Sequence, residues 1–330
     1  MKAITAIAPN QVFPTDFIPE LVIFHNVVQG FACPDGLASA WVCHQKFVIE
    51  MGYEVRFIGC TYEENPPDLT QYENILVVDF SFPVQVLELW EVEGKRVITI
   101  DHHLGFKQRI DQAKVFSLSP SILDSLYLDM TECGATLCFK LLFPGQELPV
   151  FLQYIKDRDL FEKQLPYTDE VHAGMGRLRR SFGLFDQLAV FNQFMLIDFL
   201  KPYGEITLQK KYAVITKYMK KVEFWGSDKI NICIPVVTLT QSDTQLKSDL
   251  GEFLCKNYPF APFCVILISY KKQWQPYVRI KSCAVTQDTD CVTLFADRNP
   301  GGHRNAANFS WNGSREELEA FIVGKAESLK

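Results

Sequence analysis

The chain has 330 residues, of which 48% are hydrophobic, and its formal net charge is −6 at pH 7. Because single domains usually span about 100–200 residues, this length predicts two domains with ordinary cores. A protein that binds long duplex nucleic acid needs many lysines and arginines facing phosphates, so the acidic balance excludes that class of partner.

Two further features of the sequence bear on the compartment in which the protein works. No apolar run reaches the roughly 18–20 residues of a membrane helix, and the N-terminus lacks the layout of a secretory signal. The ten cysteines are scattered, and no CxxC pair occurs among them. We therefore expect reduced thiols, a cytoplasmic location and no membrane partner.

The first half of the chain alternates strand-like and helix-like segments. Four apolar runs rich in β-branched residues resemble strands, at 21–24, 54–60, 75–80 and 96–100. Helix-like segments lie at 36–51, 131–143 and 149–161, and two longer ones at 185–201 and 204–222. This alternation predicts an α/β fold with a parallel sheet and helices on both faces.

The pattern restarts near residue 230. Strand-like segments at 231–237, 263–270 and 274–281 accompany a helix-like segment at 244–256, and a last helix begins at Arg315. We therefore predict an N-terminal domain over 1–200, a helical linker over 201–228 and a smaller α/β domain over 229–330, with a cleft between the domains.

Several acidic side chains and two histidines lie where strands or helices are expected to begin or end. They are Asp35, Asp79, Asp101, His102, His103, Asp157 and Asp159. Each residue alone has an ordinary explanation, such as a helix N-cap or a capped turn. Together, carboxylates and imidazoles near the carboxyl ends of parallel strands make an oxygen and nitrogen ligand set suited to Mn²⁺.

The order of four motifs resembles the DHH/DHHA1 phosphoesterases. The motifs are VVDF at 77–80, IDHH at 100–103, KDRD at 156–159 and GGHRNAANF at 301–309. The earlier CPDG sequence at 33–36 is similar to the branch that contains oligoribonucleases and phosphatases of small nucleotides. The resemblance implies that 1–200 form a DHH catalytic, metal-binding domain and that 229–330 form a DHHA1-type substrate-binding domain.

The resemblance also implies two metal sites that share one carboxylate. Asp79 would bridge the two ions, and Asp35, His102 and Asp157 would complete one of the sites. Asp159 is expected to be structural. We expect one or two Mn²⁺ ions, with Mg²⁺ or Co²⁺ as substitutes.

The second metal site departs from the family pattern. The family takes a histidine and an aspartate from the first motif, and these positions hold Gly30 and Cys33 here. His25 can replace the histidine only if residues 27–31 form an excursion that returns the chain to the site. Cys33 is either a soft metal ligand or a small buried thiol, and the sequence leaves both open.

Catalytic roles carried over from the family fall on Asp79, Asp101, His102 and His103. Asp101 is expected to orient His102 or His103 by a hydrogen bond. His103 is expected to face the substrate as a hydrogen-bond donor or acid.

The C-terminal domain is expected to bind the substrate. The candidate residues are Gly301, Gly302, His303, Arg279, Lys281 and Arg304. The glycines would form a loop whose backbone N–H groups approach an anion, whereas the last arginine is equally consistent with a solvated side chain. The GRLRR cluster, with Arg177, Arg179 and Arg180, could hold a phosphate, although a solvated helix face is the more ordinary interpretation.

The resemblance therefore implies a manganese-dependent phosphodiesterase, exonuclease-like, that hydrolyses short single-stranded oligonucleotides or small nucleotides through a metal-activated water. One alternative is a phosphatase that acts on 3′-phosphoadenosine phosphate or polyphosphate. Another, from a different class, is a nucleotide-binding module with impaired catalysis, motivated by the altered first motif. A homodimer is left open.

Overall fold

The computed structural model of the chain describes residues 12–28, 31–62, 64–114, 118–227, 232–270, 273–280, 290–298 and 300–329. The chain divides into two compact units, Met1–Thr207 and Leu208–Lys330. Each unit is built on its own sheet, so the predicted α/β class is confirmed. No helix within the described residues is both long and apolar enough to span a membrane.

The first unit contains a five-stranded parallel sheet in the order β3-β1-β4-β5-β6, and the short β2 pairs antiparallel with β1. The strands are β1 (Leu21–Val28), β2 (Phe31–Ala32), β3 (Arg56–Cys60), β4 (Asn74–Val78), β5 (Arg96–Asp101) and β6 (Leu126–Leu128). The chain passes from β1 to β3 on one side and then continues from β4 on the other. The carboxyl ends of β1 and β4 therefore flank a topological switch point, where open α/β sheets bind ligands.

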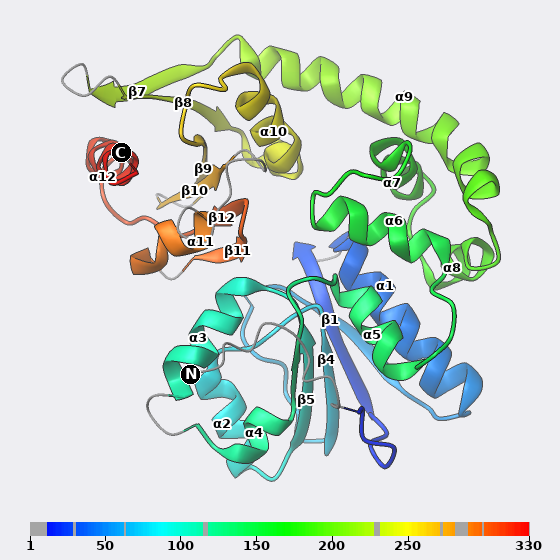
Figure 1. Cartoon of the computed structure of the whole chain (residues 1–330). Coiled ribbons are helices and arrows are strands. Elements are labelled where there is room, and N and C mark those ends of the chain that lie inside the picture. The colour runs from blue at the N-terminus through cyan, green and yellow to red at the C-terminus, as the bar shows by residue number, and fades with distance from the viewer. Residues whose placement is uncertain are drawn as a thin grey trace. The chain divides into compact units, whose positions relative to one another are not determined.

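Helices cover both faces of this sheet, as predicted (Figure 1). In β4, Leu76 and Val78 face one core and Ile75 and Val77 face the other, which explains why the strand reads as a continuous apolar run. One face carries α1 (Pro34–Cys43), α5 (Gly134–Leu142), α6 (Val150–Asp159) and α8 (Phe182–Leu188), and the other carries α2 (Val84–Val92), α3 (Leu104–Lys114) and α4 (Pro120–Asp124). A π-helical segment, His44–Glu50, extends α1, and α7 spans Thr168–Arg177.

The prediction of two long helices, at 185–201 and 204–222, is wrong about where the chain breaks between helices. A single helix, α9 (Gln193–Met219), runs through Pro202, and α8 lies before it. Leu196 and Leu200 are buried before the proline, and Leu208 and Ile215 are buried after it. Packing on both sides of Pro202 therefore outweighs the loss of one backbone hydrogen bond at the proline.

The second unit contains a six-stranded mixed sheet in the order β11-β12-β10-β9-β8-β7, in which only the β8–β9 pairing is parallel. The strands are β7 (Glu223–Ser227), β8 (Ile232–Leu239), β9 (Cys264–Tyr270), β10 (Gln273–Arg279), β11 (Gly301–His303) and β12 (Ala306–Asn308). The end of α9 and α10 (Lys247–Asn257) cover one face. Within the described residues this unit also contains the 3-10 segments Gln241–Leu246 and Ala296–Arg298, α11 (Cys291–Leu294) and α12 (Arg315–Glu327).

Candidate metal centre and active site

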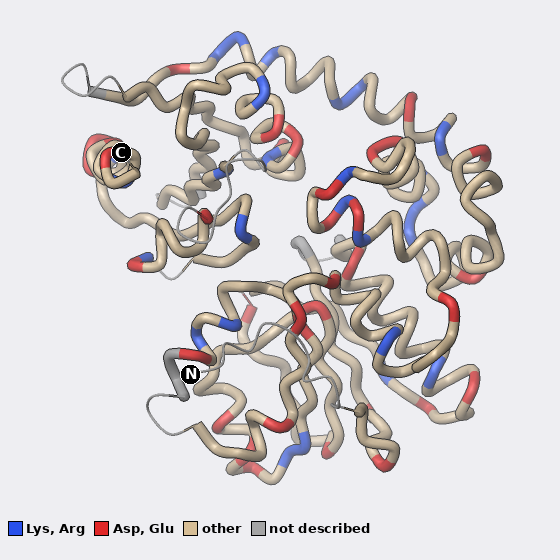
Figure 2. Tube along the Cα trace, in the orientation of Figure 1, with Lys and Arg blue, Asp and Glu red and all other residues tan. Residues whose placement is uncertain are grey.

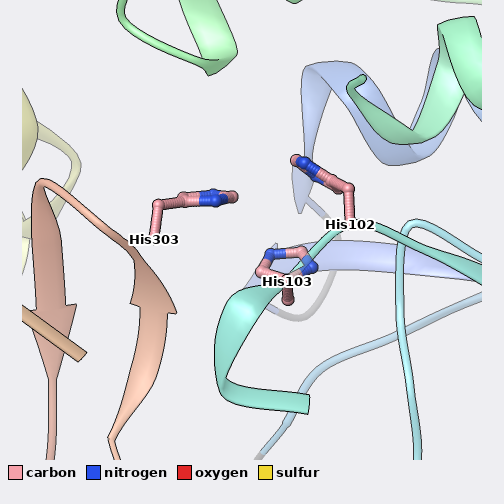
Figure 3. A group of neighbouring side chains, drawn as sticks. All are labelled: His102, His103 and His303. Carbon is pink, nitrogen blue, oxygen red and sulfur yellow. The ribbon is translucent and has the colours of Figure 1, made fainter. Parts of the chain in front are cut away.

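The carboxyl ends of three neighbouring strands carry most of the predicted site residues. His25 lies near the end of β1, Asp79 directly follows β4, and Asp101 ends β5. His102 and His103 follow Asp101 in the turn before α3, as Figure 3 shows for the two histidines. Because these strands are parallel neighbours, their ends meet at one edge of the sheet.

Asp79 lies between two groups of possible ligands. Its Oδ1 is 3.0 Å from Nε2 of His102, and its Oδ2 is 3.5 Å from Nδ1 of His25. The backbone of Asp79 has a φ of 52°, in the left-handed region that is uncommon for residues other than glycine. The start of α5 packs against this turn so closely that a Cβ at Gly134 would lie 2.5 Å from Cβ of Asp79. Tight packing therefore holds Asp79 in an unfavourable backbone conformation that points its carboxylate at both groups.

The first group consists of Asp35, Asp159 and His102. His102 Nε2 lies 3.4 Å from Asp35 Oδ2 and 3.6 Å from Asp159 Oδ2. The Asp35 carboxylate accepts hydrogen bonds from the backbone N–H groups of Gly134, at 2.6 Å, and Ala135, at 2.8 Å, at the start of α5. The helix terminus thus fixes the Asp35 side chain and leaves lone pairs directed at the group.

The prediction that Asp157 binds the metal and Asp159 is structural is contradicted by this geometry. The Asp157 carboxylate accepts hydrogen bonds from the backbone N–H groups of Gln164, at 2.8 Å, and Leu165, at 3.1 Å, and from the Thr168 hydroxyl. It therefore closes the turn after α6. Asp159 lies two residues further on, on the face of α6 that meets His102.

The second group consists of His25, Cys33 and Asp79, whose ligand atoms lie within 4.8 Å of one another. Strands β1 and β2 form a hairpin, with a register shift between Asn26 and Val28, and the Cys33 N–H donates to the His25 carbonyl at 3.2 Å. The hairpin is the excursion on which the role of His25 depended. It places an imidazole and a thiol beside the Oδ2 side of Asp79.

The charges in this region favour a bound divalent cation. Burial raises the pKa of Asp35 well above its ordinary value, and the Asp79 carboxylate adds to the shift. Burial acts in the same direction on Asp79, but the hydrogen bond from His102 and the charges of His102 and His25 hold its pKa well below the ordinary value. Burial lowers the pKa of His102, but the hydrogen bond to Asp79 and the charges of Asp159, Asp79 and Asp35 outweigh it and raise the pKa to about 10. A proton on His102 thus offsets part of the negative charge, a role that a divalent cation would take over.

Two buried oxygens support this fit to a metal. Oδ2 of Asp79 and Oδ2 of Asp159 accept no hydrogen bond within the part of the chain that the structure describes. A buried carboxylate oxygen without a hydrogen-bond donor is costly, and the nearby imidazoles, His25 at 3.5 Å from Asp79 and His102 at 3.6 Å from Asp159, are too far to donate well. A bound cation would therefore stabilise both oxygens. The donor atoms are oxygens and imidazole nitrogens, apart from the Cys33 sulfur, and such a set suits a first-row divalent ion.

His103 forms a dyad with Asp101. Asp101 Oδ1 accepts a hydrogen bond from His103 Nδ1 at 2.7 Å and one from the backbone N–H of His102 at 2.8 Å. Although burial opposes the shift, the charge of His103 lowers the pKa of Asp101 to about 2, and Asp101 in turn raises the pKa of His103. Of the two histidines offered by the sequence, Asp101 therefore orients His103.

Tyr62 is a site neighbour that was not singled out from the sequence. Its ring centroid lies 5.2 Å from that of His25, 6.0 Å from that of His103 and 4.6 Å from that of Phe80. The side chain is 50% exposed. No motif marks a lone tyrosine after a strand, so only the folded chain identifies it.

The candidate substrate residues of the second unit lie on β10 and β11. Arg279 is 3% exposed, and its guanidinium donates to the Tyr277 hydroxyl at 3.3 Å and the Ser248 hydroxyl at 3.5 Å. Arg279 thus packs within its own unit. Lys281 lies outside the described residues.

The predicted GGH loop is instead a short strand. Gly301, Gly302 and His303 form β11 and pair with β12, and Figure 3 shows the His303 side chain projecting from this strand. Gly302 has a φ of 127°, which a residue with a side chain rarely adopts. Arg304, in the turn between the strands, is exposed.

Comparisons with known proteins agree with this architecture. A scan against models of known families finds no match to the chain. Two solved structures with low sequence identity share the fold, and the description of one of them names a DHH domain. The fold is therefore that of the DHH-domain proteins, as the resemblance predicted.

A DHH domain described as belonging to a family of ribosomal proteins is 12% identical, with a TM-score of 0.58, over 92% of this chain and 86% of that one. RecJ of Thermus thermophilus, in complex with Mn²⁺, is 14% identical, with a TM-score of 0.51, over 94% of this chain and 51% of that one. Among curated sequences, uncharacterized protein R106 of Acanthamoeba polyphaga mimivirus is 26% identical over 318 residues, 92% of this chain and 70% of that protein.

Proposed function

We propose that the protein is a metal-dependent phosphoesterase that hydrolyses short oligonucleotides or small nucleotides. The observation that carries the proposal is the position of Asp79, whose two carboxylate oxygens face separate groups of metal ligands, His102 at 3.0 Å and His25 at 3.5 Å. A carboxylate shared between two ions is the arrangement that two-metal hydrolysis of phosphoesters requires.

The residues of the site divide the work of hydrolysis. Divalent ions held by these ligands would supply Lewis-acid activation of water and of the phosphoryl group. Asp35 is fixed by the start of α5, so the ligands need little rearrangement. Asp101 holds His103 by its Nδ1 and favours the protonated imidazole, so His103 can donate a hydrogen bond or a proton to a substrate oxygen.

We propose Mn²⁺ as the physiological ion at the Asp35, Asp79, His102 and Asp159 site. Hard carboxylate oxygens with one imidazole suit Mn²⁺, and the similar RecJ structure contains it. At the second site, Cys33 is a softer ligand than the family's aspartate. This site would bind Mn²⁺ less tightly and accept Co²⁺ more readily. A metal ligand that must be a free thiol also agrees with a reducing, cytoplasmic location.

Tyr62 favours a substrate that carries a base. A half-exposed aromatic ring next to His25 and His103 offers a stacking surface, whereas polyphosphate has nothing to stack. Figure 2 shows acidic positions (red) as well as basic ones (blue) along the chain. Together with the net charge of −6, this supports short single-stranded substrates rather than long duplexes.

Two alternative functions, a phosphatase and a binding module without catalysis, predict different results in the same assay. A phosphatase acting on 3′-phosphoadenosine phosphate would use the same ions and the same Tyr62 surface. A binding module without catalysis is motivated by Cys33, which replaces a carboxylate at one metal site. Under that alternative, nucleotides would bind but no phosphoester would be cut.

The test is hydrolysis of a 5′-labelled RNA dinucleotide, 3′-phosphoadenosine phosphate and polyphosphate, each with Mn²⁺, Mg²⁺ or chelator. Asp79→Asn is the matched control, because asparagine has nearly the same shape and tolerates a positive φ. We expect Mn²⁺-dependent cleavage of the dinucleotide that the variant lacks. Faster cleavage of 3′-phosphoadenosine phosphate would select the phosphatase, and no cleavage under any metal, with nucleotide binding retained, would select the binding module.

A further inference from the structure

Glu132 is a buried charged residue that the proposed chemistry does not use. It lies between β6 and α5, and 5% of its surface is exposed. Its Oε1 pairs with Nζ of Lys140 at 2.6 Å and with Nζ of Lys156 at 3.0 Å. Lys140 belongs to α5, which begins at Gly134, whereas Lys156 belongs to α6. The Glu132 carboxylate therefore links the start of α5 to α6.

The start of α5 holds one residue of the first group of metal ligands. The backbone N–H groups of Gly134 and Ala135 donate to the Asp35 carboxylate at 2.6 Å and 2.8 Å. Cys133, the N-cap residue of α5, is the one residue between Glu132 and Gly134. The position of Glu132 is therefore coupled through a short piece of backbone to the donors that fix Asp35.

The other end of the ion pair lies on the helix that carries a second ligand. Lys156 and Asp159 are three residues apart on α6, and residues at this spacing lie on the same side of a helix. Asp159 Oδ2 lies 3.6 Å from Nε2 of His102. Because rotation of α6 about its axis would move Lys156 and Asp159 together, the pair with Glu132 opposes a rotation that withdraws Asp159 from the site.

This ion pair is shielded from solvent on the Glu132 side. The Glu132 side chain is 7% exposed and that of Lys156 is 25% exposed. Water and salt screen such a pair less than they screen a pair on the surface. The link between α5 and α6 is therefore stronger than that of an ordinary surface ion pair.

We propose that Glu132 is a positioning residue of the metal centre. Through Lys156 it fixes the rotation of α6 that directs Asp159 toward His102, while the adjacent start of α5 fixes Asp35. Ligands held in place before the ion arrives bind it more tightly, because less conformational freedom is lost on binding. This inference rests on the proposed metal-dependent function, since Asp35 and Asp159 are ligands only under that function.

Positioning and simple charge predict opposite patterns of metal affinity. If Glu132 and Lys156 acted only through their charges, Glu132→Gln would weaken Mn²⁺ binding and Lys156→Met would strengthen it. If the pair positions α6, both changes weaken binding by about tenfold or more, which is the effect of removing outer partners of metal ligands. Lys156→Arg keeps a cation for Glu132 and should retain the wild-type affinity.

The experiment is calorimetric titration of Mn²⁺ into the full chain, at a temperature at which the thermal midpoints in chelator show every variant to be folded. Lys140→Met is the matched control, because it removes a partner of the same Oε1 atom but not the contact with α6. We expect wild-type affinity in Lys140→Met and Lys156→Arg, and about tenfold weaker binding in Glu132→Gln and Lys156→Met. The double variant of Glu132→Gln and Lys156→Met should bind no more weakly than either single variant, since both remove the same link.

Three results would overturn the inference. They are tighter Mn²⁺ binding in Lys156→Met, wild-type affinity in both Glu132→Gln and Lys156→Met, and a loss in Lys140→Met as large as that in Lys156→Met. Failure of the proposed function is a different result. If wild type binds no Mn²⁺, Mg²⁺ or Co²⁺, the proposed function fails and the inference fails with it, whereas tight wild-type binding that the variants keep refutes the inference alone.

Discussion

The exchange of roles between Asp157 and Asp159 gives a sharp prediction. Replacing Asp157 by alanine removes two backbone hydrogen bonds, from Gln164 at 2.8 Å and Leu165 at 3.1 Å, and one from Thr168. At about 1.5 kcal/mol for each backbone bond to a charged acceptor, the free energy of unfolding falls by about 3 kcal/mol. For a unit of this size, the thermal midpoint should fall by roughly 6–12 °C.

Asp159→Asn should behave in the opposite way. Burial and the neighbouring Asp79 carboxylate raise the pKa of Asp159, so removing its charge relieves repulsion in the absence of metal. Its thermal midpoint without metal should be equal to or above that of wild type. Its affinity for Mn²⁺ should fall by at least about 10–100-fold, since changes in even the outer partners of metal ligands have effects of that size.

The assay is differential scanning fluorimetry in chelator combined with calorimetric titration of Mn²⁺, for both variants and wild type. Asp157→Ala should lower the midpoint and, at a temperature where it is folded, bind the ion nearly normally. The reasoning is refuted if Asp157→Ala loses Mn²⁺ at an unchanged midpoint while Asp159→Asn binds it as wild type does.

Three further predictions concern other parts of the first unit. Gly134→Ala should cost about 1–3 kcal/mol in urea unfolding, because its Cβ would lie 2.5 Å from Cβ of Asp79; an unchanged midpoint would contradict the packing described. Co²⁺ added to wild type should produce a thiolate-to-cobalt charge-transfer band, and Cys33→Ser should lack it. Lys140 at 2.6 Å and Lys156 at 3.0 Å lower the pKa of the Glu132 carboxyl against the effect of its burial. These ion pairs therefore stabilise the fold at pH values above the unfolded pKa of about 4.3, and the stabilisation is lost as the pH falls through the lower pKa of the folded state. Glu132→Gln should make the free energy of unfolding less dependent on pH in this range.

The sequence was sufficient to locate the metal-centre residues that follow strands. Asp79 and the Asp101–His103 segment follow apolar runs, and parallel strands place such positions at one edge of a sheet. The helix predicted at 36–51 was located correctly at its start to within two residues, since α1 begins at Pro34, where proline fits the first turn of a helix. These features depend on local pattern and on one rule of topology.

Other features depended on geometry that spacing does not fix. Asp157 and Asp159 are separated by about 200° around a helix, so choosing between them requires the rotation of α6 against the sheet. His25 reaches Asp79 only because β1 and β2 form a hairpin with a register shift. Tyr62 became a candidate through its neighbours in space, which no motif records.

The central claim is that Asp79 is shared by two metal sites, and counting bound ions tests it most directly. Equilibrium dialysis with Co²⁺ should find two ions per wild-type chain and one in Asp159→Asn or Cys33→Ser. Asp79→Asn should lose strong binding at both sites while keeping the wild-type fold by circular dichroism. Retention of wild-type stoichiometry and affinity in Asp79→Asn would contradict the account.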